Sequence, residues 1–405
     1  MDDAQGRRTA ARTVFFCFLG ALCEGFDIQA AGVAAGGLSR DFRPTPGALG
    51  VFFSASGAGL LIGAVLGGRI ADRVGRKTVL VASIVAFGIF SFLTSLATGM
   101  PSLTAMRLLT GLGLGAAMPN LIALAADVSR AGSRNTSVAI SYVGMPLGGA
   151  VASLLVFLMP LAAWRSLFQA GGIAPLLIAP LMGRYLPAAK PGSERTAQHT
   201  ASIPARPSAG MWRELFGHGR AFSTLFLWLG FFLIVLTLHL MLNWLPLLLL
   251  GRGLLKSQAA IAQFAFGVSG AAAAFWLGSL LDSRWQRTSI AVSLVMCPVV
   301  MLFIAIAPPR PGVLLVLASL LGSAILASQV IVYAAASAVY PVACRGTGVG
   351  AAVGAGRLGS LVGPLFAASL LAAGRSPAQV LIGVLPIAVV GGVCAGFLGW
   401  RELRK

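Results

Sequence analysis

Charged residues are scarce in this sequence, and acids are scarcer still. Only 10% of the 405 residues are charged, against about 25% in an average soluble protein. Eleven residues are acids, whereas 57% of all residues are hydrophobic. A soluble protein of this length needs more polar surface than such a composition provides. The composition therefore excludes an ordinary soluble protein and predicts an all-α membrane protein with many spanning helices.

Histidine and cysteine are also rare, with three and five residues, and neither type shows the spacing of a metal site or a disulfide framework. We expect no metal and no cofactor. An intramembrane enzyme needs a nucleophile with its base, or metal ligands, at membrane depth, so we do not expect an enzyme. His239 is the one histidine within an apolar run. A proton relay, a substrate contact and a hydrogen-bonded packing role all stay open for it.

Basic residues outnumber acids, and the net charge is +19. They fall mainly between apolar runs, where they set membrane topology, so we expect no nucleic-acid partner. With the N-terminus in the cytoplasm, 21 of the 30 Lys and Arg residues lie in cytoplasmic segments and seven in outside loops. This bias predicts that both termini are cytoplasmic.

A membrane-spanning helix needs about 20 mostly apolar residues. Twelve such runs occur, at 13–38, 48–69, 78–99, 101–126, 136–159, 166–183, 221–250, 258–281, 288–307, 312–339, 347–372 and 378–400. Residues 184–220 interrupt the series, because they are rich in Pro, Ala and Ser and lack an apolar helical face. We predict a cytoplasmic linker there, between six-helix bundles formed by residues 1–183 and 221–405.

An internal repeat supports this division. The stretch "GRIADR" from Gly68 matches "GSLLDSR" from Gly278, at an offset of 210. The stretch "RNTSVAISYVGMPLG" from Arg134 matches "RGTGVGAAVGAGRLG" from Arg345, at an offset of 211. Duplicated halves favour a transporter that rocks about a central site over a pore or an enzyme.

The stretch "GGRIADRVGRK", residues 67–77, resembles the signature loop of the major facilitator superfamily between its second and third helices. The stretch "RLLTGLGLGAAMPN" from Arg107 resembles that family's fourth-helix motif. The resemblance implies the major facilitator fold, which has twelve transmembrane helices in two six-helix bundles. It also implies that helices one, four, seven and ten line a central cavity.

The stretch "EGFD" from Glu24 resembles the first helix of the aromatic acid:proton symporters, although Asp is usual where this chain has Glu24. Other stretches, such as "NWLPLLL", most resemble the bacterial 3-(3-hydroxyphenyl)propionate transporters. The resemblance implies a proton-coupled importer of aromatic carboxylic acids in the lipid bilayer of the bacterial inner membrane, working by alternating access. We expect a monomer. A proton-antiport exporter of drugs or metabolites is the alternative.

Four charged residues lie deep in apolar runs, namely Glu24, Asp27, Arg107 and Arg357. A charge at the centre of a membrane helix costs about 2.5–3.5 kcal/mol even on insertion scales. Glu24 and Asp27 are three residues apart and share a helix face. Desolvation favours a neutral carboxyl, and a neighbouring arginine favours the ionised form. A carboxyl balanced between the two exchanges protons, so we predict that Asp27 and Glu24 form a proton-coupling site.

A substrate carboxylate that leaves water needs a fixed cation, and arginine offers a planar, bidentate fork. Arg107 is close to Asp27 in depth, which makes it the expected partner of the proton site. We therefore expect Arg357 to bind the carboxylate, with Arg107 as the other candidate. Further polar or aromatic candidates for the cavity are Gln29, Asn120, Tyr142, Asn243, Trp244, Gln329 and Tyr333.

The loop at 67–77 and its repeat carry charges that would hold the two halves together on the cytoplasmic side. An acid there caps a neighbouring helix or pairs with an arginine, while the basic residues anchor at the membrane surface. The alternative is that these residues only set topology. The predicted conformational latch consists of Gly68, Asp72, Arg73, Arg76, Asp282 and Arg284.

Overall fold

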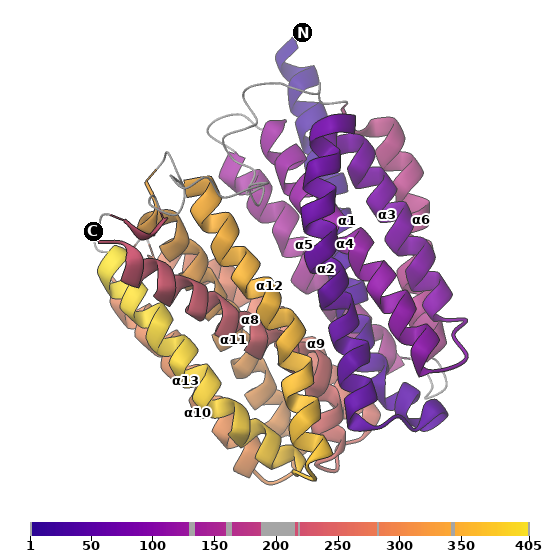
Figure 1. Ribbon diagram of the computed structural model, residues 1–405, viewed down its shortest axis with the longest axis vertical. Coiled ribbons are helices and arrows are strands. Elements are labelled where there is room, and N and C mark those ends of the chain that lie inside the picture. Colours follow the sequence, from indigo (N-terminus) through magenta and orange to yellow (C-terminus); the bar gives the residue numbers. More distant parts are fainter. Residues whose placement is uncertain are drawn as a thin grey trace. The chain divides into compact units, whose positions relative to one another are not determined.

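The computed structural model describes residues 2–128, 134–158, 164–187, 215–217, 219–281, 283–341 and 345–403. Within these ranges the chain forms twelve long helices and no strand (Figure 1). The helices are α1 (Asp2–Phe42), α2 (Pro46–Val74), α3 (Arg76–Thr94), α4 (Met100–Asp127), α5 (Arg134–Leu158), α6 (Trp164–Tyr185), α8 (Ala221–Leu250), α9 (Lys256–Leu281), α10 (Gln286–Ile306), α11 (Pro311–Val339), α12 (Arg345–Ala372) and α13 (Pro377–Glu402).

Each predicted apolar run coincides with one of these helices. Eleven are long and apolar enough to cross a membrane, and α5 adds a shorter apolar stretch, Val143–Leu158. Helices suit a bilayer because their backbone polar groups are satisfied internally. The largest difference from the prediction is at α1, which begins at Asp2 rather than near residue 13. The preceding residues include Ala, Gln and Arg, which have high helix propensity and extend the helix beyond its apolar run.

The chain divides into two compact units. One consists of residues 1–43 and 55–200, and the other of residues 44–54 and 201–405. Helices α1 and α3–α6 belong to the first unit, α8–α13 belong to the second, and α2 is divided between them. The predicted linker lies mostly outside the described residues, so the boundaries of the two predicted halves stay a prediction.

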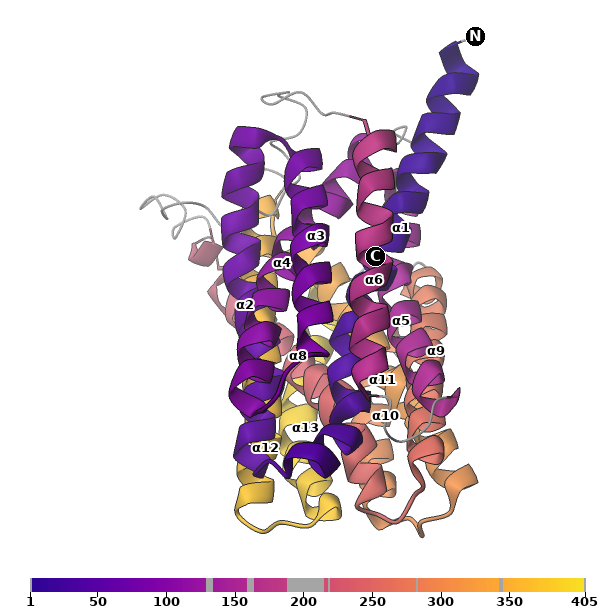
Figure 2. The ribbon, with the colours of Figure 1, turned by 90° about the vertical axis from the view of Figure 1, so that its right-hand side faces the viewer.

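In the first unit, α3 lies beside α4 and α6, and α1 lies beside α5 (Figure 2). Glycines make the crossing of α1 and α5 close. A Cβ atom at Gly25 would lie 2.8 Å from the Cα of Met145, and one at Gly148 would lie 2.8 Å from the backbone N of Phe26. Small residues at such positions let two membrane helices approach until their backbones touch.

The second unit repeats this arrangement with α8 and α12, which lie side by side (Figure 1). A Cβ atom at Gly359 would lie 2.9 Å from the backbone N of Leu236. Gly148 and Gly359 are matched in the sequence repeat at an offset of 211. Each lies where its own helix crosses the first helix of its unit, so the repeat in sequence corresponds to a repeat in packing.

Candidate functional site

Two acids of α1, Glu24 and Asp27, lie in the interior of the first unit. The side chain of Asp27 is 0% exposed and that of Glu24 is 1% exposed. Both flank Gly25, where the backbone of α1 is in close contact with α5. The helix therefore holds the two carboxyl groups on one face, at a point where its own position is restricted by the neighbouring helix.

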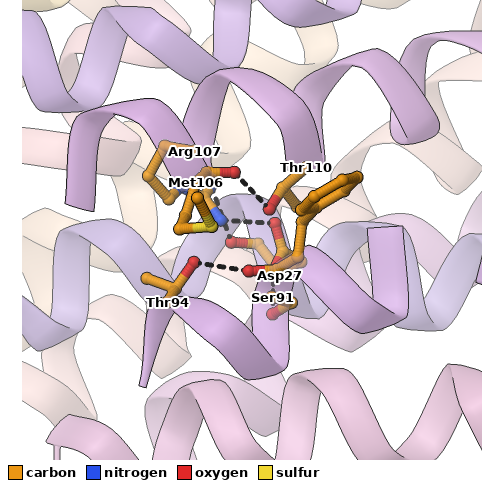
Figure 3. Close-up of polar contacts among 7 residues, drawn as sticks. Asp27, Ser91, Thr94, Met106, Arg107 and Thr110 are labelled. Atoms are coloured by element: carbon orange, nitrogen blue, oxygen red, sulfur yellow. Dashed lines mark hydrogen bonds and ion pairs between the residues drawn. The ribbon is translucent and has the colours of Figure 1, made fainter. Parts of the chain in front are cut away.

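Asp27 accepts hydrogen bonds from two other helices (Figure 3). The guanidinium of Arg107, on α4, donates from Nη1 to Oδ2 at 2.6 Å, and from Nη2 to the backbone carbonyl of Asp27 at 3.3 Å. The hydroxyl of Ser91, on α3, donates to Oδ1 at 2.6 Å. Both carboxylate oxygens are thus occupied by donors, which is the arrangement that stabilises an ionised aspartate.

Arg107 is as deeply buried as the acid, at 1% exposure. Its Cζ lies 5.7 Å from the centre of the Phe168 ring on α6, within cation–π distance. Its Nε has no hydrogen-bond partner among the described residues. Breaking a buried ion pair by removing one partner typically costs about 3–5 kcal/mol. The ion pair therefore joins α1 to α4 in the interior of the first unit.

The predicted neighbourhood of Asp27 and Arg107 is confirmed as a direct ion pair. The sequence analysis did not identify Ser91 or Phe168. Ser91 is a polar residue within an apolar run, but serine often bonds to its own helix, so its type alone gave no signal. Nearby Thr94 does so, because its hydroxyl donates to the carbonyl of Phe90 (Figure 3).

Arg357, on α12 in the second unit, is half-buried. It forms no ion pair within the described part of the chain. One turn earlier on the same face is Gly354, where a Cβ atom would meet no described atom within 4 Å. Arg357 therefore differs from Arg107, whose charge is already balanced by an acid. A guanidinium without an acid partner beside open space is suited to bind an anion.

The other cavity candidates lie in both units. Gln29, Asn120 and Asn243 are buried. Asn120 donates to the carbonyl of Ala116 on its own helix at 2.8 Å, which leaves part of its amide for other partners. Tyr333 is 37% exposed, and its ring packs edge-on against another ring of its unit. The side chain of Tyr142 lies outside the described residues. Contact of these residues with a substrate stays a prediction.

The signature loop contains one glycine whose conformation matters. Gly75 has φ of 92° directly before α3, a left-handed conformation that glycine adopts without strain. A close helix approach is found at Gly67, where a Cβ atom would lie 2.6 Å from the Cα of Ala116. No described atom lies within 4 Å of a Cβ atom at Gly68, so this neighbouring glycine is not at a close approach among the described residues.

The arginines of the predicted latch lie at or next to helix ends. Arg73 is exposed and Arg76 is half-buried. Arg284 is exposed, with its Cζ 5.4 Å from the centre of the Trp285 ring. The side chains of Asp72 and Asp282 lie outside the described residues. Closure by these residues therefore stays a prediction.

The described residues contain no group of three His, Cys, Asp or Glu side chains arranged to bind a metal ion. The described cysteines are buried and form no disulfide; they are Cys17, Cys23, Cys297 and Cys394.

Comparison with known proteins agrees with this geometry. Residues 17–364 match the Major Facilitator Superfamily. The 3-(3-hydroxy-phenyl)propionate transporter of Escherichia coli (strain K12) is 39% identical over 97% of this chain and 94% of its own length. The gallate transporter of Pseudomonas putida is 32% identical over 88% of this chain and 85% of its own length.

The fold is also found among solved structures. The crystal structure of a bacterial homolog to the human lysosomal transporter Spinster, inward-facing and unoccupied, has a TM-score of 0.77 at 16% identity and covers 98% of both chains. That identity is too low to carry more than the fold. The family match covers most of the chain and the first relative 97% of it, and this multi-pass membrane protein therefore belongs to the Major Facilitator Superfamily.

Proposed function

We propose that this protein is a proton-coupled symporter that imports aromatic carboxylic acids, with 3-(3-hydroxyphenyl)propionate or a close hydroxylated aromatic acid as its substrate. The observation that carries the proposal is the fully buried Asp27 carboxylate, paired with Arg107 and hydrogen-bonded by Ser91. A buried acid of this kind in a membrane helix is costly and marks a functional site. The printed names of relatives that resemble it over most of their length support the substrate class.

Asp27 is the proposed proton carrier. In the ionised state its carboxylate holds Arg107, and in the protonated state that attraction is lost. The energy of the pair is thus available to couple proton binding to a rearrangement of α1 against α4. Glu24, on the same helix face and equally buried, is the second proposed proton-coupling residue. The chain would alternate between inward-open and outward-open states during this cycle.

Arg357 is the proposed anchor of the substrate carboxylate. Its guanidinium has no ion-pair partner in the described part of the chain, whereas Arg107 already has Asp27. An anion that binds Arg357 therefore needs to break no existing pair. Gly354, one turn earlier, has open space beside its Cα, which supports access of the substrate carboxylate to Arg357 from that face of α12.

The remaining assignments follow from the sequence. We propose a monomer in the bacterial inner membrane. The distribution of Lys and Arg supports a cytoplasmic place for both termini. The predicted linker at 184–220 would join halves formed by residues 1–183 and 221–405. The residues around Asp72 and Asp282 would form the cytoplasmic latch.

The test uses purified protein in proteoliposomes and radiolabelled 3-(3-hydroxyphenyl)propionate. An imposed inward proton gradient should drive accumulation above equilibrium, and a protonophore should abolish it. Asp27→Asn keeps the size of the side chain but cannot titrate, so accumulation should be lost while the protein still inserts and purifies. Accumulation driven only by a proton gradient of the opposite direction would indicate the antiport exporter. Gradient-driven accumulation by Asp27→Asn at the parent level would remove Asp27 from the mechanism.

The roles of the two arginines are distinguished by measuring substrate binding to purified Arg357→Lys and Arg107→Lys proteins. Lysine keeps the charge but loses the planar fork. Arg357→Lys should weaken binding of the aromatic acid at least about tenfold, which corresponds to the loss of one charge-assisted hydrogen bond. If only Arg107→Lys weakens binding, the two roles are reversed.

A further inference from the structure

The second unit contains a buried histidine that the proposed mechanism does not use. His239 lies in the middle of α8 and is 8% exposed. Its Nδ1 is 3.1 Å from the backbone carbonyl of Val235, one turn earlier in the same helix. A carbonyl oxygen only accepts hydrogen bonds, so Nδ1 must carry the hydrogen. The ring is thereby held in one tautomer and bent back along the helix.

The charge of the ring follows from its surroundings. After residue 220 the sequence has only two acids, Asp282 and Glu402, and both fall outside the apolar runs at 258–281 and 378–400. Arg357 follows Gly356, where a Cβ atom would lie 3.2 Å from Cγ2 of Val235, one turn before His239 on α8. An imidazolium there would be buried beside a guanidinium with no acid from its own half, so the ring is neutral.

A neutral ring that donates from Nδ1 has a bare lone pair at Nε2. This Nε2 atom is buried and has no hydrogen-bond partner among the described residues. Leaving a buried acceptor without a donor costs stability, and native proteins do so rarely. Nε2 can therefore accept a hydrogen bond from a ligand. A carboxylate cannot donate that bond, because it only accepts hydrogen bonds.

The position of the ring links it to Arg357. His239 shares a face of α8 with Leu236, which is in contact with Gly359 of α12. Arg357 lies two residues before that contact. The proposed carboxylate anchor and the unsatisfied acceptor therefore lie on neighbouring parts of two helices that pack closely within one unit.

We propose that Nε2 of His239 accepts a hydrogen bond from the phenolic hydroxyl of a substrate, and so makes the protein select ring-hydroxylated aromatic acids. This inference rests on the proposed function, because it assigns the second polar group of the substrate whose carboxylate binds Arg357. A phenol is a donor that an unsubstituted ring lacks. A site built to bond a hydroxyl rejects the analogue without it, because the buried acceptor is then left unpaired.

The test compares three acids as competitors of labelled 3-(3-hydroxyphenyl)propionate uptake in proteoliposomes. They are the unlabelled acid itself, 3-phenylpropionate, which lacks the hydroxyl, and 3-(3-methoxyphenyl)propionate, which keeps the oxygen but has no donor hydrogen. In the parent protein the hydroxylated acid should compete at least about tenfold better than either analogue, the cost of one unpaired buried acceptor. Equal competition by the methoxy and hydroxyl compounds would overturn the inference without any mutation.

Two variants test the residue itself. His239→Leu removes the acceptor. In this variant the inhibition constants of 3-phenylpropionate and of the hydroxylated acid should become nearly equal, so that their ratio is close to one. His239→Gln keeps an acceptor and should restore part of the preference, which a purely structural role would not predict. An unchanged ratio in His239→Leu would overturn the assignment. If the parent protein takes up no labelled 3-(3-hydroxyphenyl)propionate, the proposed function itself fails, whereas uptake that all three acids inhibit equally contradicts only the role of His239.

Discussion

Gly25 offers the sharpest test of how the proton site is built. In Gly25→Ala the new Cβ atom would lie 2.5 Å from the carbonyl carbon of Met145 and 2.8 Å from its Cα. Carbon atoms in ordinary contact are about 3.5–4.0 Å apart, so α1 and α5 must separate by about 1 Å. The obstacle is backbone, which cannot rotate away as a side chain can.

Overpacking costs about 1–3 kcal/mol, and the upper value applies to a clash with backbone. Alanine recovers about 1 kcal/mol through its higher helix propensity, which leaves a net loss of about 2 kcal/mol. Gly183→Ala on α6 is the matched control, because its Cβ atom would meet only Cγ1 of Val81, at 4.0 Å. The control should gain up to about 1 kcal/mol, so the two variants should differ by about 3 kcal/mol.

The assay is thermal unfolding of the purified variants in detergent, together with proton-driven uptake in proteoliposomes. A difference of about 3 kcal/mol corresponds to a separation in melting temperature on the order of 10 °C for a unit of this size. Gly25→Ala should also lose uptake, because a shift of α1 disturbs the 2.6 Å contact between Asp27 and Arg107. Melting temperatures within about 2 °C of each other, with full uptake by Gly25→Ala, would refute the reasoning.

Ser91→Ala removes a hydrogen bond to a charged group, which typically contributes about 1.5–3 kcal/mol. The variant should therefore slow proton-driven uptake, but less than Asp27→Asn does. Uptake at the parent rate would contradict this. Gly359→Ala should lower the melting temperature as Gly25→Ala does, because its Cβ atom would meet the backbone of α8, and an unchanged melting temperature would argue against the repeated packing. In a Cys344→Ser background, a bulky maleimide should label the buried cysteines only after denaturation, as mass spectrometry would show.

The helices of this protein could be predicted from the sequence alone, because the requirement for about 20 apolar residues is local and each span carries it within itself. All twelve predicted runs coincide with helices. The charged candidate residues could be predicted equally well, since a charge within an apolar run is costly wherever it lies. That rule alone selected Glu24, Asp27, Arg107 and Arg357 as candidates.

The contacts of these residues were decided by the tertiary structure. Ser91 and Arg107 are 64 and 80 residues from Asp27, and no local pattern encodes which helix faces α1. The sequence likewise left three roles open for His239, because a histidine in a helix can bond in several ways. The role proposed for it rests on the fold, which placed Nδ1 against a carbonyl and buried Nε2 without a donor among the described residues. The length, hydrophobicity and charge of a membrane-spanning run are properties of one segment. Whether a buried polar atom finds a hydrogen-bond partner depends on every segment packed around it.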